Sequence, residues 1–150
     1  MLRNPDMALP LYIDVTTGEA RVSLTGPIRQ RMKFFLNDLT ALKIAFVQNG
    51  AVVSAAFLEA GSSTMKVGIR AKPGQGSILA EATTYAYANP ESDVILPLDA
   101  TALTNYFSAN ISADQKEAEF HLEVQVTNAA ATTRMTVYQS PCLIGREVNV

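Results

Sequence analysis

His121 is the only histidine of the chain, and it stands between Glu119 and Glu123 in a stretch that alternates polar and apolar residues. Side chains two residues apart point the same way in an extended strand, so one imidazole and two carboxylates would share a face. Such a set could hold a metal ion or supply the base of a metal-assisted hydrolase. Alternating charges are also typical of the solvated face of a strand, and we favour that interpretation.

Three other features could carry chemistry. The segment 63–66 has the Ser-x-x-Lys spacing of some acyl-transfer enzymes, but the companion motifs are missing from the chain. Gly74-Gln75-Gly76 lacks the third glycine of a phosphate-binding loop. Cys142 has no cysteine partner for a disulfide or a zinc cluster, and we expect it to be buried. We therefore predict a protein that is not an enzyme, with no catalytic, cofactor-binding or metal-binding residues and no cofactor.

The stretch from Lys116 to Val126 predicts a strand with one buried face. Its apolar members recur at every second position, which fits a pleated strand and would scatter them around a helix. These members are Ala118, Phe120, Leu122, Val124 and Val126.

Turn signals divide the rest of the chain into further short strands. Gly18 predicts a hairpin between 11–15 and 19–24, and Asn49-Gly50 predicts a type I′ hairpin between 41–47 and 51–58. The other predicted strands are 65–70, 77–88, 93–98, 132–139 and, after an interruption at Pro141, 143–144.

One segment changes to helical spacing. Asp99 can cap a short helix in which Leu103, Tyr106 and Phe107 share a face. Residues 28–39 after Pro27 also fit a helix, but we favour a strand at 31–36.

These elements predict an all-β fold, an antiparallel β-sandwich of about eight strands with one short helix. The 150 residues, of which 48% are hydrophobic, suffice for one core. We expect an N-terminal arm over residues 1–10 and a single sandwich domain over 11–150.

Charge and hydropathy limit the partners that we expect. A net charge of −2 supplies no basic field for nucleic acid or an anionic membrane surface. No apolar run is long enough to span a bilayer, and the first residues do not resemble a signal peptide, so we expect synthesis in a cytoplasm.

Assembly with other copies is the interaction that we favour. The arm carries Leu2, Met7 and Leu9 without strand alternation, so it could pack on a neighbouring subunit, although packing on its own domain stays open. We also assign Leu143 and Ile144 to a subunit interface. Weakly charged strands near 80–88 and 129–133 suit lateral contact in a homo-oligomer.

The order of segments resembles β-sandwich proteins and N-terminal domains of tail-fibre, baseplate and related structural proteins of tailed bacteriophages. The resemblance spans most of the chain and lies in packing and turn patterns. Its segments are Leu11-Tyr12-Ile13-Asp14 with Thr17-Gly18, Leu42 to Phe46 with Asn49-Gly50, Met65 to Arg70, Leu79 to Thr83, Leu96-Pro97-Leu98-Asp99 with Thr101-Ala102-Leu103, Leu122-Glu123-Val124, and Leu143-Ile144.

The resemblance implies a non-enzymatic virion protein, made in the host cytoplasm, that assembles with other virion proteins in the tail, baseplate or fibre. A head decoration or head-to-tail connector protein is the alternative within this class. A receptor- or carbohydrate-binding module is the alternative from another class, since sandwiches often host such sites. Tyr85, Tyr87 and Tyr106 would be its candidate sugar-stacking residues.

Overall fold

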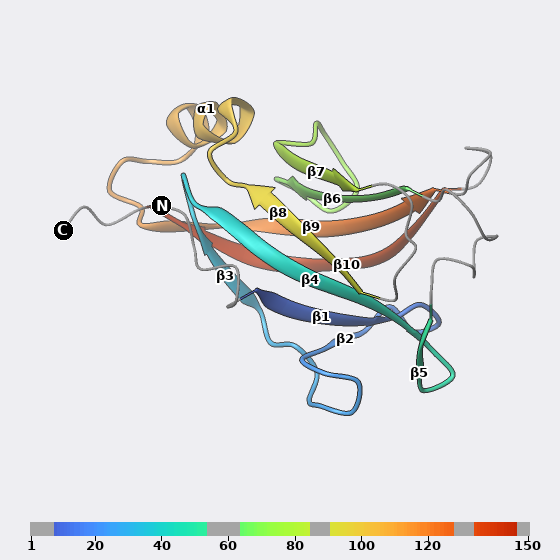
Figure 1. The fold of residues 1–150 in the computed structure, drawn as a ribbon. Coiled ribbons are helices and arrows are strands. Elements are labelled where there is room, and N and C mark those ends of the chain that lie inside the picture. Colours follow the sequence, from blue (N-terminus) through green and yellow to red (C-terminus); the bar gives the residue numbers. More distant parts are fainter. Residues whose placement is uncertain (1–7, 54–63, 85–90, 128–133, 147–150) are drawn as a thin grey trace.

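The computed structural model describes residues 8–53, 64–84, 91–127 and 134–146 (Figure 1). Over these residues the chain forms ten β-strands in two curled sheets, with one α-helix. This confirms the predicted mostly-β class with one short helix. The strand directions and the strand number differ from the prediction, as the pairing within each sheet shows.

Sheet A contains the first strands of the chain, in the order β2-β1-β4-β5, and β8 pairs with β4 as well. Residues 39–45 of β4 pair with β8 and residues 46–48 pair with β5, so β8 and β5 occupy successive parts of the same side of β4. The strands are β1 (Leu9–Asp14), β2 (Ala20–Arg21), β4 (Leu39–Gln48), β5 (Ala51–Val53) and β8 (Glu91–Pro97).

Sheet B has the order β3-β10-β9-β6-β7. Its centre is the long antiparallel pair of β9 and β10, which β4 and β8 of sheet A cross in the view of Figure 1. The strands are β3 (Met32–Phe35), β6 (Thr64–Arg70), β7 (Ala80–Thr84), β9 (Glu117–Thr127) and β10 (Arg134–Gly145). β7 lies against β8, so the two sheets meet along that side.

Most strand pairs are antiparallel, as predicted for the sandwich, but both sheets are mixed. β1 pairs with β4 in parallel, and β3 pairs with β10 in parallel. A parallel pair needs a crossover connection. Here the chain leaves β1, forms β3 in the other sheet and returns to β4. Hairpin signals report only neighbours in sequence, so they could not indicate this crossover.

One core lies between the two sheets. Phe120, Leu122, Val124 and Val126 are buried on the inner face of β9, which confirms the alternation predicted for that strand. They pack with the inner faces of β1, β4, β6 and β8, and Cys142 is buried among them as predicted. Burying apolar side chains from both sheets in one cluster is the main force that holds the sheets together.

The predicted turns take the expected backbone conformations. Asn49 and Gly50, with φ of 53° and 79°, join β4 to β5, as a type I′ hairpin requires. Gly18, with φ of 77°, lies between β1 and β2, although β2 is only two residues long. The strand favoured at 31–36 is confirmed as β3.

The helix α1 (Thr101–Asn110) starts differently from the prediction. Its N-cap residue is Ala100, and no side chain caps it, so the capping role predicted for Asp99 is wrong. The helix is held by packing instead. Leu103 and Phe107 are buried, and the Phe107 ring stacks on Phe120 with 5.3 Å between centroids.

The other end of α1 is closed by Arg146, which follows β10. Its guanidinium donates hydrogen bonds to the carbonyl oxygens of Ile111, Ser112 and Gln115, at 3.0–3.1 Å. It also lies over the Phe107 ring, 5.3 Å from the centroid. These carbonyls belong to the C-cap residue of α1 and to the turn that follows it, so Arg146 fixes that turn and places a cation near the C-terminal end of the helix dipole.

Pro141 lies inside the continuous strand β10, whereas the prediction ended a strand there. It pairs with His121 of β9 on one side, and on the other side the β3 ladder begins only at Cys142. A proline is tolerated in a strand where its missing N–H would have no ladder partner. The interruption predicted at Pro141 is therefore wrong.

Candidate functional site

The outer face of β9 carries the row that the sequence singled out, and its members differ in burial. The side chain of Glu119 is 50% exposed, that of His121 is 16% exposed and that of Glu123 is 6% exposed. The solvated face that we predicted is therefore correct at Glu119 and wrong at Glu123. Glu123 is among the few buried charged residues in the described part of the chain.

Each carboxylate of this row has a cation beside it. Glu117 and Glu119 reach across β10 to β3, where Lys33 Nζ lies 2.9 Å from Glu117 and Arg31 lies 3.5 Å from Glu119. His121 Nε2 is 3.7 Å from Glu119 Oε1. These ion pairs therefore span β10 and join β9 to the strand beyond it, which favours one register of the three strands.

The buried Glu123 is held by two residues. Arg70 Nε, on β6, lies 3.3 Å from Glu123 Oε2, and Gln125 Nε2 donates to Glu123 Oε1 at 2.6 Å. The Arg70 Nε atom is at ion-pair distance but makes no hydrogen bond, so we treat its contact with Glu123 as a charge interaction.

The loop 71–79 between β6 and β7 covers this pair. Arg70 Nη1 donates to the Gly76 carbonyl, which turns the loop back over the sheet. A methyl group on Gly74 would lie 3.9 Å from Gln139 Nε2, and Gln139 is directly opposite Glu123 on β10. The loop therefore crosses β9 at Glu123, which explains the burial of a charge on an outer sheet face.

These contacts bear on the chemistry considered for His121. No three His, Cys, Asp or Glu residues within the described ranges form a group that could hold a metal ion. The ion pairs of this row join β9 to β6 on one side and, across β10, to residues 31–33 on the other.

The two weaker motifs fall on structural elements. Ser63 lies outside the described residues, and Lys66 extends from β6 to Glu81 of β7, 3.7 Å away. Gly74 and Gly76 adopt positive φ of 65° and 76° in the loop that covers Glu123.

The residues assigned to a subunit interface are in different environments. Leu2 and Met7 lie outside the described residues, as do 129–133. Leu9 is the first residue of β1, so the sheet begins within the predicted arm, and it is partly buried against the core. Leu143 is half-buried on the outer face of sheet B, but Ile144 is fully buried in the core. The side chain of Ile144 is therefore not available to another subunit, which corrects that assignment.

A groove opens between β3 and the start of β1, and we call it the β3 groove. Its volume is about 380 Å³. The groove is lined by Leu9, Val22 and the segment 27–33. Ile28 is 46% exposed, and three basic side chains but no acidic one line the groove. The predicted interface residue Leu9 thus lies at an apolar and basic depression.

A second depression, the sheet A hollow, lies on the outer face of sheet A and has a volume of about 520 Å³. Pro10, Lys43 and Asp93 are directly opposite one another on β1, β4 and β8, and Tyr12 lies beside them. Val22 lines both depressions, and Ser23 lines the hollow. Sequence patterns missed this set because its members come from three strands.

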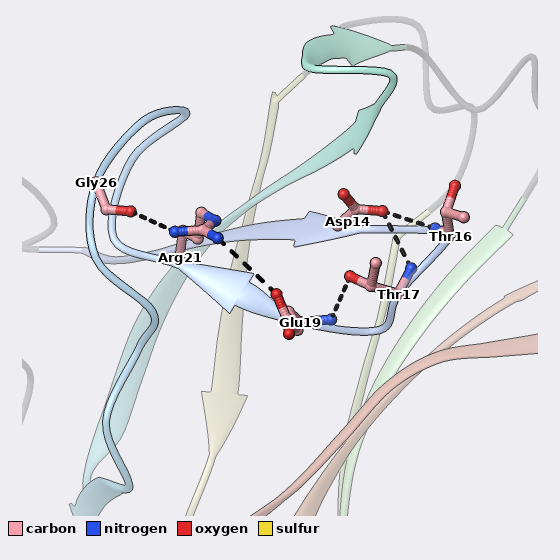
Figure 2. A network of polar contacts seen from close by, with 6 residues as sticks. All are labelled: Asp14, Thr16, Thr17, Glu19, Arg21 and Gly26. Carbon is pink, nitrogen blue, oxygen red and sulfur yellow. Dashed lines mark hydrogen bonds and ion pairs between the residues drawn. The ribbon is translucent and has the colours of Figure 1, made fainter.

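The loop that forms the shared wall is anchored by the network in Figure 2. Asp14 Oδ1 accepts hydrogen bonds from the backbone N–H groups of Thr16 and Thr17, at 2.8 and 3.1 Å, and so fixes the β1–β2 turn. Arg21 then links this turn to the loop, because its Nη1 donates to the Gly26 carbonyl at 3.0 Å while its Nη2 lies 3.9 Å from Glu19.

Arg29 lies where the β3 groove meets the core. Its Nη2 donates to the Pro10 carbonyl at 2.6 Å, and its Nε is buried with no hydrogen-bond partner among the described residues. Burial lowers the pKa of Arg29, and the nearby Tyr138 opposes that shift; burial also raises the pKa of Tyr138. Burial raises the pKa of the Cys142 thiol to about 12, so this thiol is held protonated.

The tyrosines proposed for sugar stacking are not brought together. Tyr85 and Tyr87 lie outside the described residues. Tyr106 packs edge-on against Phe120, with 5.7 Å between ring centroids, so part of its ring already serves the attachment of the helix. The aromatic residue at a described depression is Tyr12.

None of the described helices is both long and apolar enough to cross a membrane. Comparison of the chain with protein-family models, with curated proteins and with solved structures finds no match.

Proposed function

We propose that this protein is a non-enzymatic structural protein of a bacteriophage virion, made in the host cytoplasm and assembled in several copies in the tail, baseplate or fibre. One observation supports the proposal most directly. The sequence segments that resemble tailed-phage structural proteins fall, in order, on β1, β4, β6, β7, β8, α1, β9 and β10. The resemblance therefore concerns the packing elements of the whole described fold.

The two curled sheets support the same proposal at the level of fold. They enclose one apolar core, and we infer that they are a variant of the β-sandwich in which two pairings have become parallel. The ion pairs across β3, β9 and β6 leave the outer face of sheet B with few unmatched charges. A stiff, charge-matched sheet suits a component that must keep its shape within an assembly.

The contacts between copies would involve Leu2, Met7 and Leu9 at the N-terminus, together with Leu143. Leu9 lines the β3 groove and Leu143 is half-buried on sheet B, so each offers apolar area close to the surface. We assign no such role to Ile144.

Particle composition tests this function. We expect mass spectrometry of purified virions to detect the chain in several copies per particle, and fractionation of tails from heads to separate a tail component from a head decoration or connector protein. In solution, Leu2→Asp combined with Met7→Asp should reduce the oligomer mass, whereas Ile95→Asp, on a residue 52% exposed on β8, should leave it unchanged. A monomeric protein that is absent from particles would contradict the proposal.

A receptor- or carbohydrate-binding role is favoured by one observation, the sheet A hollow. It combines an aromatic ring with a base, an acid and a hydroxyl, at Tyr12, Lys43, Asp93 and Ser23. Such groups can stack on a sugar ring and bond its hydroxyls. We expect Tyr12→Ala to remove glycan-array signals that Ile95→Ala retains. If no glycan binds the unaltered protein, this role is excluded for the glycans on the array.

A further inference from the structure

No described strand pairs with the second side of β3, because β3 is the outermost strand of sheet B and its ladder is with β10. The Leu36 N–H donates to the Gly145 carbonyl at 2.8 Å, so the backbone groups of residue 36 point to β10. Backbone direction alternates along a strand. The N–H and C=O of Lys33 therefore point away from β10, toward the side where the β3 groove lies.

The neighbouring edge of sheet A is closed to strand pairing. The Asp14 N–H donates to the Glu19 carbonyl, so the backbone N–H and C=O groups of the even-numbered residues of β1 point to the side of β2. β2 is short and pairs with Tyr12 and Ile13, so the backbone of Pro10 lies on that side without a strand opposite it. At that side Pro10 has no N–H, and its carbonyl already accepts a hydrogen bond from Arg29. Proline and a capping charge are common protections of a strand edge. β1 thus cannot offer the backbone groups that β3 offers.

The basic side chains of β3 do not cover its edge. Lysine often protects an edge strand by projecting past it. Here Lys33 lies back across β10, with its Nζ 2.9 Å from Glu117 and 5.3 Å from the centroid of the Phe35 ring. Gly145 allows this path, since a Cβ there would lie 3.4 Å from Lys33 Cε. Arg31 is likewise held by Glu119.

We propose that the free edge of β3 is a docking site for an extended segment of a partner chain, which adds a strand and carries apolar and acidic side chains. The apolar side chains fit because Leu9, Ile28 and Met32 line the groove. The acidic side chains fit because Arg29 lines the groove with its buried Nε lacking an acceptor among the described residues, and because no acidic residue lines the groove, whereas Arg31 and Lys33 are already paired. Pairing with the β3 edge of a second copy is disfavoured, because it would bring two Arg29 side chains together and supply neither with an acidic partner.

This docking site deepens the proposed assembly role and rests on it for the nature of the partner. A direct probe is a fluorescent seven-residue peptide that alternates Val and Glu, with a Val and Lys peptide as the charge control. Fluorescence anisotropy with the full chain should show saturable binding of the glutamate peptide, weakened by salt, and much weaker binding of the lysine peptide. Equal binding of both peptides, or no binding of either, would overturn the proposal.

Two variants isolate the backbone contact. Lys33→Ala and Lys33→Pro both lose the ion pair with Glu117, but only the proline loses the outward N–H, at an edge where proline is tolerated. We expect the proline variant to bind the glutamate peptide about two- to tenfold more weakly than the alanine variant, the effect of one backbone hydrogen bond. Equal affinities of two folded variants would contradict strand addition.

Hydrogen exchange on the unaltered protein provides a measurement that does not depend on the folding of a variant. The amide of Lys33 should exchange more slowly once the glutamate peptide is bound, and binding without that protection would place the peptide elsewhere. Peptide binding that occurs only after deletion of residues 1–7 would assign the groove to the chain's own N-terminus and overturn the partner assignment. Absence of the chain from virions would refute the assembly role without altering these results.

Discussion

Arg70, which is partly buried, forms an ion pair with the buried Glu123 on a sheet face that the sequence marks as solvent-exposed, with Nε 3.3 Å from Oε2. The pair joins β6 to β9, and the loop 71–79 shields it from water. A buried pair adds little net stability relative to apolar residues, but removal of one partner leaves an uncompensated charge. This asymmetry leads to the first prediction.

Glu123→Ala should lower the free energy of unfolding by about 3 kcal/mol, because Arg70 would stay shielded without a counter-charge. Urea denaturation followed by circular dichroism measures the change. Glu119→Ala is the matched control from the same strand: its side chain is half exposed, so a loss of at most about 1 kcal/mol is expected. If both variants lose the same amount, the buried position of Glu123 has no energetic role. A double variant with Arg70→Ala should recover part of the loss.

Arg146→Gln should destabilise the end of α1, since it removes a cation bonded to the Ile111, Ser112 and Gln115 carbonyls. We expect a loss of about 1 to 3 kcal/mol, the range for hydrogen bonds to a charged group. Arg146→Lys keeps the positive charge, but a single ammonium group cannot bond all three carbonyls as the planar guanidinium does. Its loss of unfolding free energy should therefore lie between those of the unaltered protein and the glutamine variant. Amide exchange within α1 reports the same effect locally. Exchange in α1 that is unchanged in the glutamine variant would refute this role.

Leu122→Ala should cost about 2 to 5 kcal/mol, because Leu122 is fully buried in the core shared by the two sheets. Ile95→Ala removes a side chain that is half exposed on the outer face of β8 and should cost about 0.5 kcal/mol or less. Thermal unfolding of the two variants measures the difference. Similar losses would show that the core does not lie between the sheets.

Gly26→Ala should distort the loop that forms the wall between the two depressions. An added Cβ would lie 2.7 Å from Val22 Cγ2 and would also meet Ser23 Oγ, so the loop has to shift. Glycan signals or glutamate-peptide binding should then weaken, while the melting temperature changes by only a few degrees. Gly50→Ala is the control for a loss of stability without a loss of binding: its φ of 79° strains an alanine, so the melting temperature should fall, but Gly50 lines neither depression. Unaltered binding by Gly26→Ala would exclude Val22 and Ser23 from both sites.

Alkaline pH should destabilise the protein through Cys142. The pKa of this thiol is raised to about 12 in the folded state, whereas an unfolded cysteine titrates near about 8.5. The unfolded chain therefore releases the proton first, so stability is complete below about pH 8 and falls as pH rises toward 12. The slope from this group is at most about 1.4 kcal/mol per pH unit. Tyr138, whose pKa burial also raises, acts in the same direction at higher pH.

Urea midpoints recorded from pH 7 to pH 11 test this dependence. Cys142→Ala removes the thiol and should show a shallower decline above pH 8.5, whatever stability it loses at neutral pH. A decline as steep as that of the unaltered protein would assign the alkaline effect to other groups.

Local sequence rules predicted most single elements. The alternation in β9, the Asn49-Gly50 turn and the face of α1 that contains Leu103 and Phe107 each depend on neighbours within a few residues. The same rules failed where the cause lies in another strand. Pro141 is tolerated within β10 because the ladder with β3 begins only at Cys142, so no strand lies opposite Pro141 on that side. Glu123 is buried because the loop that follows β6 covers it.

The depressions were outside the reach of sequence reasoning for the same reason. Lys43 and Asp93 meet only because β4 pairs with β8, and Arg29 reaches Pro10 only after the chain has crossed between the sheets. The sequence contains one signal of the β3 groove, because the apolar character of Leu9 predicts an interface residue and Leu9 lines the groove. The basic residues that line the groove with Leu9 come from a segment far from Leu9 in the sequence, so no strand or helix period relates them to it.

The parallel pairing of β3 with β10 has a consequence for how the chain reaches its folded state. It joins residues 32–35 to residues 142–145, with β4 to β9 between them in the sequence. Such a contact closes a long loop, and the chain loses conformational entropy before the favourable strand contacts form. Proteins rich in long-range pairings therefore fold in about milliseconds to seconds. On the ribosome, β3 has to wait unpaired until β10 has been synthesised. During that interval its edge is open on both sides, and a chaperone or an early-bound partner would find it most accessible.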